Sequence, residues 1–178
     1  SPIDELELLS PANHYAVSKV AMELMAANFR HEFPIVVTRP FNYTGPGQAI
    51  NFLIPKLVHH FKAKLPVIEL GNLNVEREFN DVRMVCEAYL ALLKLPIERG
   101  HLEVFNICSG QTYALQEVIQ LLTEITGHSL EVKVNPAFVR RHEVHQLCGN
   151  SAKLIHAIGP LRTYALRDTL QTMLEASE

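Results

Sequence analysis

The sequence contains no tryptophan, only three cysteines, and no apolar run approaching the roughly 20 residues that a bilayer-spanning helix requires. We therefore expect no membrane partner. The cysteines, Cys86, Cys108 and Cys148, are odd in number and widely spaced, which argues against the disulfide framework of a secreted domain. Buried free thiols in a reducing cytoplasm are the plainer interpretation, and Cys86 fits a small core residue on its helix.

The sequence also lacks an excess of positive charge. Its 16 lysines and arginines stand against 19 acidic residues, a formal net charge of −3. Binding to phosphate backbones needs a concentrated basic face, so we expect no nucleic-acid partner. With 178 residues, 48% of them hydrophobic and 20% charged, the chain has the balance of a globular domain with a sizeable core.

Two further features are missing. The chain opens Ser1-Pro2-Ile3-Asp4 with no initiator methionine and no signal sequence, so we expect that a preceding segment has been removed. In addition, no strand is followed by a G-x-G-x-x-G turn, the phosphate-binding start of a complete dinucleotide-binding domain. The pair Gly45 and Gly47 comes nearest, but Ile50 stands where the third glycine should fall.

Helical and strand patterns alternate along the chain. Apolar residues at helical spacing predict helices over 14–31, 52–63, 82–92, 115–125, 151–158 and 166–174. Short β-branched or alternating runs predict strands over 35–39, 67–70, 103–107 and 130–134. The first of these runs is apolar on both faces, which is typical of a buried parallel strand. The alternation predicts an α/β fold, with a loop over 41–48 at the strand end where such sheets bind ligands.

Tyr15 and Lys19 are the first candidates for chemistry. Residues four apart share one face of a helix. A nearby ammonium group favours the phenolate form of tyrosine, so this phenol can exchange a proton with an alcohol or a carbonyl oxygen. Taken alone, the pair also fits an ordinary exposed helix face.

The surrounding residues form a longer pattern. The segment Ser10-Pro11-Ala12-Asn13-His14-Tyr15-Ala16-Val17-Ser18-Lys19, with Glu23 after it, resembles the S-P-Y-x-x-S-K helix of the extended short-chain dehydrogenases/reductases, the nucleotide-sugar epimerase/dehydratase family. Further blocks follow in that family's order: TRPFNYTGPGQ at 38–48, FLIP at 52–55, GNL at 71–73, REFNDVR at 77–83, FNICSG at 105–110, and then Arg140, Glu143, Gly149, Asn150, Lys153 and Leu154. The resemblance covers nearly the whole chain.

The resemblance implies roles for individual residues. Tyr15 is implied as the catalytic acid/base and Lys19 as its partner, which also holds the nicotinamide ribose. The remaining cofactor contacts are implied for Pro40, Phe41 and Asn42, and substrate contacts for Asn42, Asn72, Arg77, Arg140 and Glu143. Arginine suits the diphosphate of a sugar nucleotide because its planar guanidinium contacts phosphate oxygens in pairs. Arg83, on the helix that Asp81 opens, is expected to be structural.

The resemblance also implies a fold and a reaction. We expect the C-terminal half of an NAD(P)-binding Rossmann-like fold with its small α/β substrate-binding domain. Residues 1–48 and segments near 75–108 are assigned to the Rossmann part, and 49–74 and 109–178 to the substrate-binding part. The implied reaction is NADP- (or NAD-) dependent reduction of a nucleotide-linked 4-keto-6-deoxy sugar. The sequences of the G-P-G-Q and C-S-G motifs favour GDP-linked substrates. Family members commonly dimerise, which implies a homodimer with Ala21, Leu24 and Met25 near its interface.

Several alternatives stay open. The chain also fits a dehydratase of GDP-mannose, another nucleotide-sugar epimerase, or a non-catalytic fragment that binds sugar nucleotides without the cofactor-binding half. His142, His145 and Cys148 have ligand-type side chains at close spacing, but no fourth ligand is evident and we expect no metal. Residues 5–7 are expected to form a loose leader, and His59 and His60 a solvated helix edge.

Overall fold

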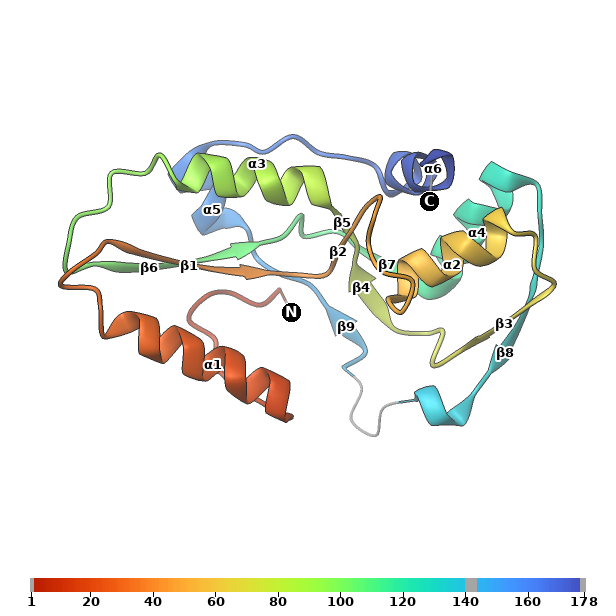
Figure 1. Cartoon of the computed structure of the whole chain (residues 1–178), viewed down its shortest axis with the longest axis horizontal. Helices are drawn as coiled ribbons and strands as arrows, with labels where there is room; N and C mark the ends of the chain where they lie inside the picture. Colours follow the sequence, from red (N-terminus) through yellow and green to blue (C-terminus); the bar gives the residue numbers. More distant parts are fainter. Residues whose placement is uncertain (1, 140–143, 177–178) are drawn as a thin grey trace.

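Two parallel strands form the centre of one lobe. In the computed structural model of the chain, which describes residues 2–139 and 144–176, β1 (Ile35–Pro40) pairs with β6 (Leu102–Ile107) in a register running from Ile35↔Leu102 to Pro40↔Ile107. Helices α1 (His14–Ala27) and α3 (Val82–Leu92) lie on opposite faces of this pair (Figure 1). The strands predicted over 35–39 and 103–107 are confirmed, and so is the parallel pairing expected of the first.

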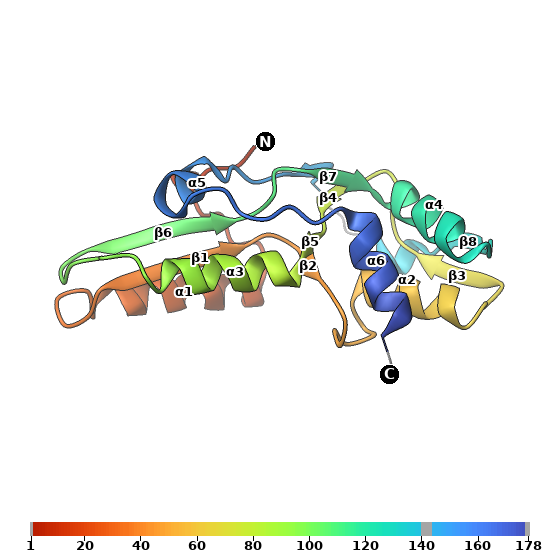
Figure 2. The same cartoon turned by 90° about the horizontal axis from the view of Figure 1, so that it is seen from above.

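The second lobe is built mainly from helices. It contains α2 (Leu53–Lys62), α4 (Leu115–Thr126) and α6 (Leu166–Glu175), with β3 (Val67–Leu70) paired in parallel to β8 (Glu131–Val134) at its outer end. Figure 2 shows this group beside the β1–β6 lobe rather than stacked on it. A short 3₁₀ helix, η1 (Pro136–Phe138), follows β8.

Short strands join the two lobes. β4 (Glu76–Glu78) pairs antiparallel with β7 (Thr112–Ala114) and parallel with β9 (Gln146–Leu147). β2 (Tyr43–Thr44) pairs in parallel with β5 (Asn80–Asp81), so the loop predicted over 41–48 contains a short strand. The chain then returns through α5 (Ala152–Ile158) to the first lobe and crosses along α3 to α6 (Figures 1 and 2).

Local side-chain chemistry sets the helix ends. The Oδ1 of Asn13 accepts from the Ala16 N–H at 2.9 Å and begins α1, and Asp81 does the same for α3 by accepting from the Arg83 N–H at 2.8 Å. Gly127 ends α4 with a left-handed φ of 65°. α1 ends at Ala27, four residues before the predicted end at His31.

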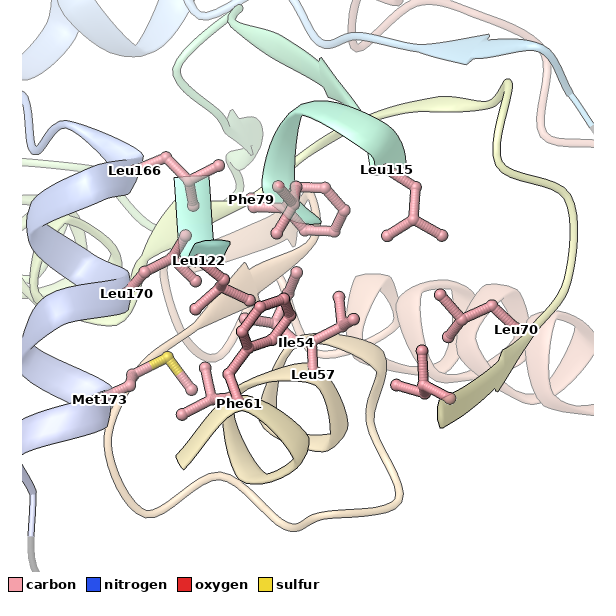
Figure 3. Close-up of a cluster of buried hydrophobic side chains, with 13 residues drawn as sticks. Ile54, Leu57, Phe61, Leu70, Phe79, Leu115, Leu122, Leu166, Leu170 and Met173 are labelled. Atoms are coloured by element: carbon pink, nitrogen blue, oxygen red, sulfur yellow. The ribbon is translucent and has the colours of Figure 1, made fainter. Parts of the chain in front are cut away.

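Each lobe has its own apolar core. Figure 3 shows the core of the second lobe, in which side chains from α2, α4 and α6 converge on Phe61, Leu57 and Leu122. The core of the first lobe joins α3, β6 and α5: Met84, Val85, Ala88, Leu92, Phe105, Ile107 and Leu154. Each fully buried large apolar side chain contributes about 1.5–3 kcal/mol relative to exposure. Each cluster therefore stabilises the fold of its own lobe.

Two burial expectations prove wrong. Cys86 is exposed, because the buried face of α3 runs through Met84, Val85, Ala88 and Leu92. In β1 only Val37 is buried, because among the described residues β6 is the only strand that pairs with it. α1 likewise has no buried residue. No helix in the described residues is long and apolar enough to cross a membrane.

The loose leader expected over residues 5–7 is wrong for Glu5, because residues 3–5 are bound to β6 and its surroundings, whereas Leu6 and Glu7 are exposed. The Glu5 carboxylate accepts from the Asn106 N–H at 2.8 Å, the Ile3 carbonyl accepts from Asn106 Nδ2 at 3.0 Å, and Ile3 forms a bridge with Gly149. These contacts occupy the edge of β6 that faces away from β1. Side chains on either side, such as Leu6, stay exposed.

Candidate active site

Tyr15 and Lys19 lie together on α1, as their spacing predicts. The Lys19 ammonium is 5.4 Å from the centroid of the Tyr15 ring, and the tyrosine is 72% exposed. The Asn13 cap fixes the first turn, and the Ser18 hydroxyl donates to the Tyr15 carbonyl at 2.7 Å. The pair is therefore held on a well-formed helix and is open to a ligand.

An ion pair attaches α1 to the strand beneath it. Arg39 on β1 donates from Nε and Nη2 to the two carboxylate oxygens of Glu23, at 3.0 and 2.7 Å, and from Nη1 to the Glu5 carbonyl at 3.2 Å. The hydrogen bond to Glu23 outweighs partial burial and raises the pKa of Arg39. Because α1 buries no side chain, this bidentate contact orients the helix on the sheet.

The residues directly after β1 tie that strand to the rest of the chain. The Phe41 N–H donates to the Ile107 carbonyl at 2.9 Å, and the Phe41 ring leaves no space for a side chain at Gly149. The Asn42 carbonyl accepts from both the backbone and the side-chain amide of Asn80, at 2.9 and 3.1 Å. Pro40 and Asn42 are exposed, so the backbone here is fixed while the Asn42 amide remains available.

Two of the predicted substrate residues lie near β4. Arg77 donates to the carbonyls of Glu76 and His145, at 2.8 and 3.2 Å, which places it beside the segment leading into β9. The Asn72 side chain accepts from the Asn74 N–H at 3.0 Å and forms a local turn. Arg140 and Glu143 lie outside the described residues.

The contacts thus form separate groups. Tyr15 and Lys19 are together on α1, Asn42 is joined to β5, and Arg77 is joined to the approach to β9. Among the described residues, no hydrogen bond or ring contact connects Tyr15 to Pro40, Phe41 or Asn42.

Glu78 is the residue that sequence reasoning missed. Its side chain is 1% exposed, and its two oxygens accept from five donors: Gly149 N at 2.6 Å, Ser109 N at 2.9 Å, Asn80 Nδ2 at 3.1 Å, and Ser109 Oγ and Gly110 N at 3.3 Å. A buried carboxylate is tolerated when its lone pairs are filled in this way. The available signal was an acid in a short strand between an arginine and a phenylalanine, which does not reveal its partners.

A cavity of about 270 Å³ lies between the lobes, on the side of α3 and α6. Asn80, Cys108, Ser109 and Tyr164 are among its lining residues, and none of the predicted site residues that the structure describes is among them. Burial raises the pKa of Cys108 to about 12, so this thiol is no nucleophile. The zinc alternative includes His142, outside the described residues, and no group of three potential metal ligands occurs within the described part.

The sequence of this chain is similar to those of known proteins over most of its length. Residues 1–173 match the family model described as GDP-mannose 4,6 dehydratase. The chain is 40% identical over 178 residues to GDP-6-deoxy-D-talose 4-dehydrogenase of Aggregatibacter actinomycetemcomitans, covering 96% of this chain and 60% of the relative. It is 36% identical to GDP-6-deoxy-D-mannose reductase of Pseudomonas aeruginosa, covering 97% of this chain and 58% of the relative.

A solved structure agrees with these sequence matches. RMD from Pseudomonas aeruginosa, complexed with NADPH, superposes with a TM-score of 0.88 at 33% identity, covering 97% of this chain and 59% of that one. The fold is therefore the mixed α/β, Rossmann-like fold of the extended short-chain dehydrogenases/reductases. Within that class, the chain belongs to the GDP-mannose 4,6 dehydratase family. The chain spans about 60% of the length of these two curated relatives.

Proposed function

We propose that this protein takes part in NADP(H)-dependent reduction, at C4, of a GDP-linked 4-keto-6-deoxy hexose, with Tyr15 as the acid/base. The observation that carries the proposal is the exposed Tyr15–Lys19 pair on α1, in a chain 36–40% identical to a GDP-6-deoxy-D-mannose reductase and a GDP-6-deoxy-D-talose 4-dehydrogenase. NAD is the alternative cofactor, and the related structure complexed with NADPH favours NADP.

The residues present fit the nicotinamide end of such a cofactor. An exposed ammonium beside an exposed phenol offers a donor to a ribose hydroxyl and a proton to a reacting oxygen. When bound, the nicotinamide supplies the hydride that reduces the carbonyl carbon. Tyr15 donates its hydroxyl proton to the carbonyl oxygen, and the resulting phenolate is favoured by the positive charge of Lys19.

The other site residues are proposed to bind rather than to react. Pro40 ends β1, Phe41 and Asn42 follow it, and all three are proposed to line the cofactor, with the Asn42 amide also reaching the sugar. Arg77 and Arg140 are proposed to contact the diphosphate, and Asn72 and Glu143 the remainder of the substrate. The fixed backbone at Asn42 and the placement of Arg77 beside His145 support these assignments.

We also propose the division into a cofactor part, 1–48 with 75–108, and a substrate part, 49–74 with 109–178. Separate cores in the two lobes support a division of this kind, although Leu154 of α5 packs in the core of the first lobe and Phe79 in the core of the second. A homodimer through α1 is supported by the exposed side chains Leu24 (67%) and Met25 (66%) beside Ala21. Three free cysteines favour a reducing compartment such as the cytoplasm.

The test is NADPH oxidation by the full-length gene product with GDP-4-keto-6-deoxy-mannose. Oxidation with stoichiometric formation of a 4-hydroxy product supports the proposal, and the configuration at C4 distinguishes the 6-deoxymannose from the 6-deoxytalose product. The family model favours a second candidate, GDP-mannose 4,6-dehydratase. Conversion of GDP-mannose to a keto product with no net cofactor consumption would establish that candidate instead.

Calorimetry on the 178-residue chain, with GDP and with NADPH, distinguishes a non-catalytic role from the proposed catalytic one. Binding of GDP without binding of NADPH is expected if the chain acts as a sugar-nucleotide-binding fragment. If neither ligand binds, the chain has no ligand function by itself. The kinetic assay on the full-length product then decides whether the site functions in the whole protein.

A further inference from the structure

Glu23 shares the face of α1 that carries Tyr15 and Lys19. The three residues are spaced at i, i+4 and i+8, and Glu23 is the only acidic residue of the helix. A carboxylate four residues from a lysine is within reach of its ammonium. On its own helix, therefore, Glu23 is positioned to compete with Tyr15 for Lys19.

The structure shows Glu23 occupied elsewhere. Both of its oxygens accept from Arg39, and the two side chains are only 18% and 22% exposed. Nη1, the third nitrogen of the same guanidinium group, donates to the Glu5 carbonyl. This contact restricts rotation of the Arg39 side chain away from Glu23. Within the described part of the chain no carboxylate lies in salt-bridge range of Lys19, whose ammonium lies near the Tyr15 ring instead.

We propose that Arg39 is a positioning residue. By binding Glu23, it keeps this carboxylate from pairing with Lys19, so that the Lys19 ammonium stays beside Tyr15. Arg39 touches neither the phenol nor the ammonium and acts through Glu23. The inference deepens the proposed function, since it concerns the same proton donor. It predicts that removal of the guanidinium releases Glu23 to pair with Lys19, which draws the ammonium from Tyr15 and disfavours the phenolate.

The surrounding charges make the effect specific to this pair. Among residues 2–139 and 144–176, the charged groups from neighbouring elements that interact at this side of α1 are Arg39 from β1 and Glu5 from the segment before α1. On α1 itself they are His14, Lys19 and Glu23. The eight-residue step from Tyr15 to Glu23 spans about 12 Å of helix axis, which exceeds the Debye length of about 8 Å at physiological ionic strength. A freed Glu23 must therefore act on Tyr15 mainly through Lys19.

The experiment measures Tyr15 directly, so its outcome does not depend on enzymatic activity. The 178-residue chain is labelled with [¹³Cζ]tyrosine, the Tyr15 signal is assigned with Tyr15→Phe, and its titration midpoint is followed by NMR at 0.15 M salt. We expect Arg39→Gln to raise the midpoint by about 0.3 pH unit, the size of one exposed helical ion pair. The double variant Arg39→Gln/Glu23→Gln should return within 0.1 pH unit of Glu23→Gln alone.

Two further variants separate this role from a merely structural one. Arg39→Lys keeps an ion pair with Glu23 and should leave the midpoint unchanged, and in a Lys19→Gln background Arg39→Gln should shift it by less than 0.1 pH unit. If Arg39→Gln does not fold, Arg39→Met retains the apolar stem and carries the same expectation. An unchanged midpoint in the folded single variant, a shift that persists in the double variant, or a shift that survives loss of Lys19 would overturn the proposal. Failure of the NADPH assay alone would overturn the proposed function and leave this result standing.

Discussion

The Glu78 carboxylate accepts a 2.6 Å hydrogen bond from the backbone N–H of Gly149, a residue 71 positions further along the chain. The same carboxylate binds the turn after β6 through Ser109 and Gly110. One buried side chain thus joins β4, the end of β6 and the residues after β9. These are the elements through which the two lobes meet.

Glu78→Gln is expected to destabilise the fold by about 2–4 kcal/mol, because an amide directs N–H donors at backbone N–H groups that then lose their acceptor. Denaturant unfolding followed by circular dichroism measures the loss. The matched control is Glu124→Gln, whose exposed ion pair with Arg167 should contribute less than about 1 kcal/mol. Equal losses in the two variants would contradict the role given to Glu78.

The stability of the protein should fall as the pH drops below about 4, with Asp81 as a principal cause. Burial works against the charged form of this carboxyl, which is 2% exposed, but hydrogen bonds from Arg83 and Thr169 hold its pKa below the ordinary value of 3.8. A lowered folded-state pKa gives stability that is present above the unfolded-state pKa and is lost as the pH falls through the folded-state pKa.

The variant Asp81→Asn tests this linkage. It should cost about 1–3 kcal/mol at pH 7 and should lose less stability than the wild type between pH 5 and pH 3. Thermal unfolding at several pH values gives both quantities. Glu131→Gln is the control, because its 4.0 Å contact with Lys133 is exposed and should contribute almost nothing. A pH dependence identical in Asp81→Asn and the wild type would exclude Asp81 as the cause.

Thiol reactivity should separate the three cysteines. Cys86 is exposed, whereas burial raises the pKa of Cys108 to about 12 and also raises the pKa of Cys148. The thiolate is the reactive form, so a thiol reagent at pH 8 should modify Cys86 first and Cys108 only on unfolding. Mass spectrometry of a time course measures the order, and Cys86→Ser should remove the fast phase. Rapid labelling of Cys108 in the folded protein would contradict its buried position.

Tyr15→Phe should reduce kcat of the full-length product at least about 100-fold, the usual contribution of a positioned proton donor. Because Tyr15 is exposed and its hydroxyl makes no hydrogen bond among the described residues, unfolding stability should stay within about 0.5 kcal/mol of the wild type. Tyr43→Phe, another exposed tyrosine, serves as the control and should retain full activity. Substantial activity in Tyr15→Phe would assign the proton to a different group.

Much of the architecture follows from local patterns. The residue at which each of α1 and α3 begins is readable from Asn13 and Asp81, since a capping side chain bonds an amide two or three residues ahead. The order of helices and parallel strands follows from hydrophobic spacing. The short strands β4, β7 and β9 were not predicted from the sequence. A strand of two or three residues shows too little periodicity, and the pairing partners of these strands are distant in sequence.

For the candidate site the division is similar. The sequence by itself determined that Tyr15 and Lys19 share a helix face, because spacing along a helix is a local property. Only the tertiary structure decided that Arg39 binds Glu23, that Glu78 lies buried among five donors, that residues 3–5 bind β6, and that Cys86 faces outward. These contacts arise from how finished elements pack, and a burial pattern along one helix or strand does not specify which distant groups will cover it.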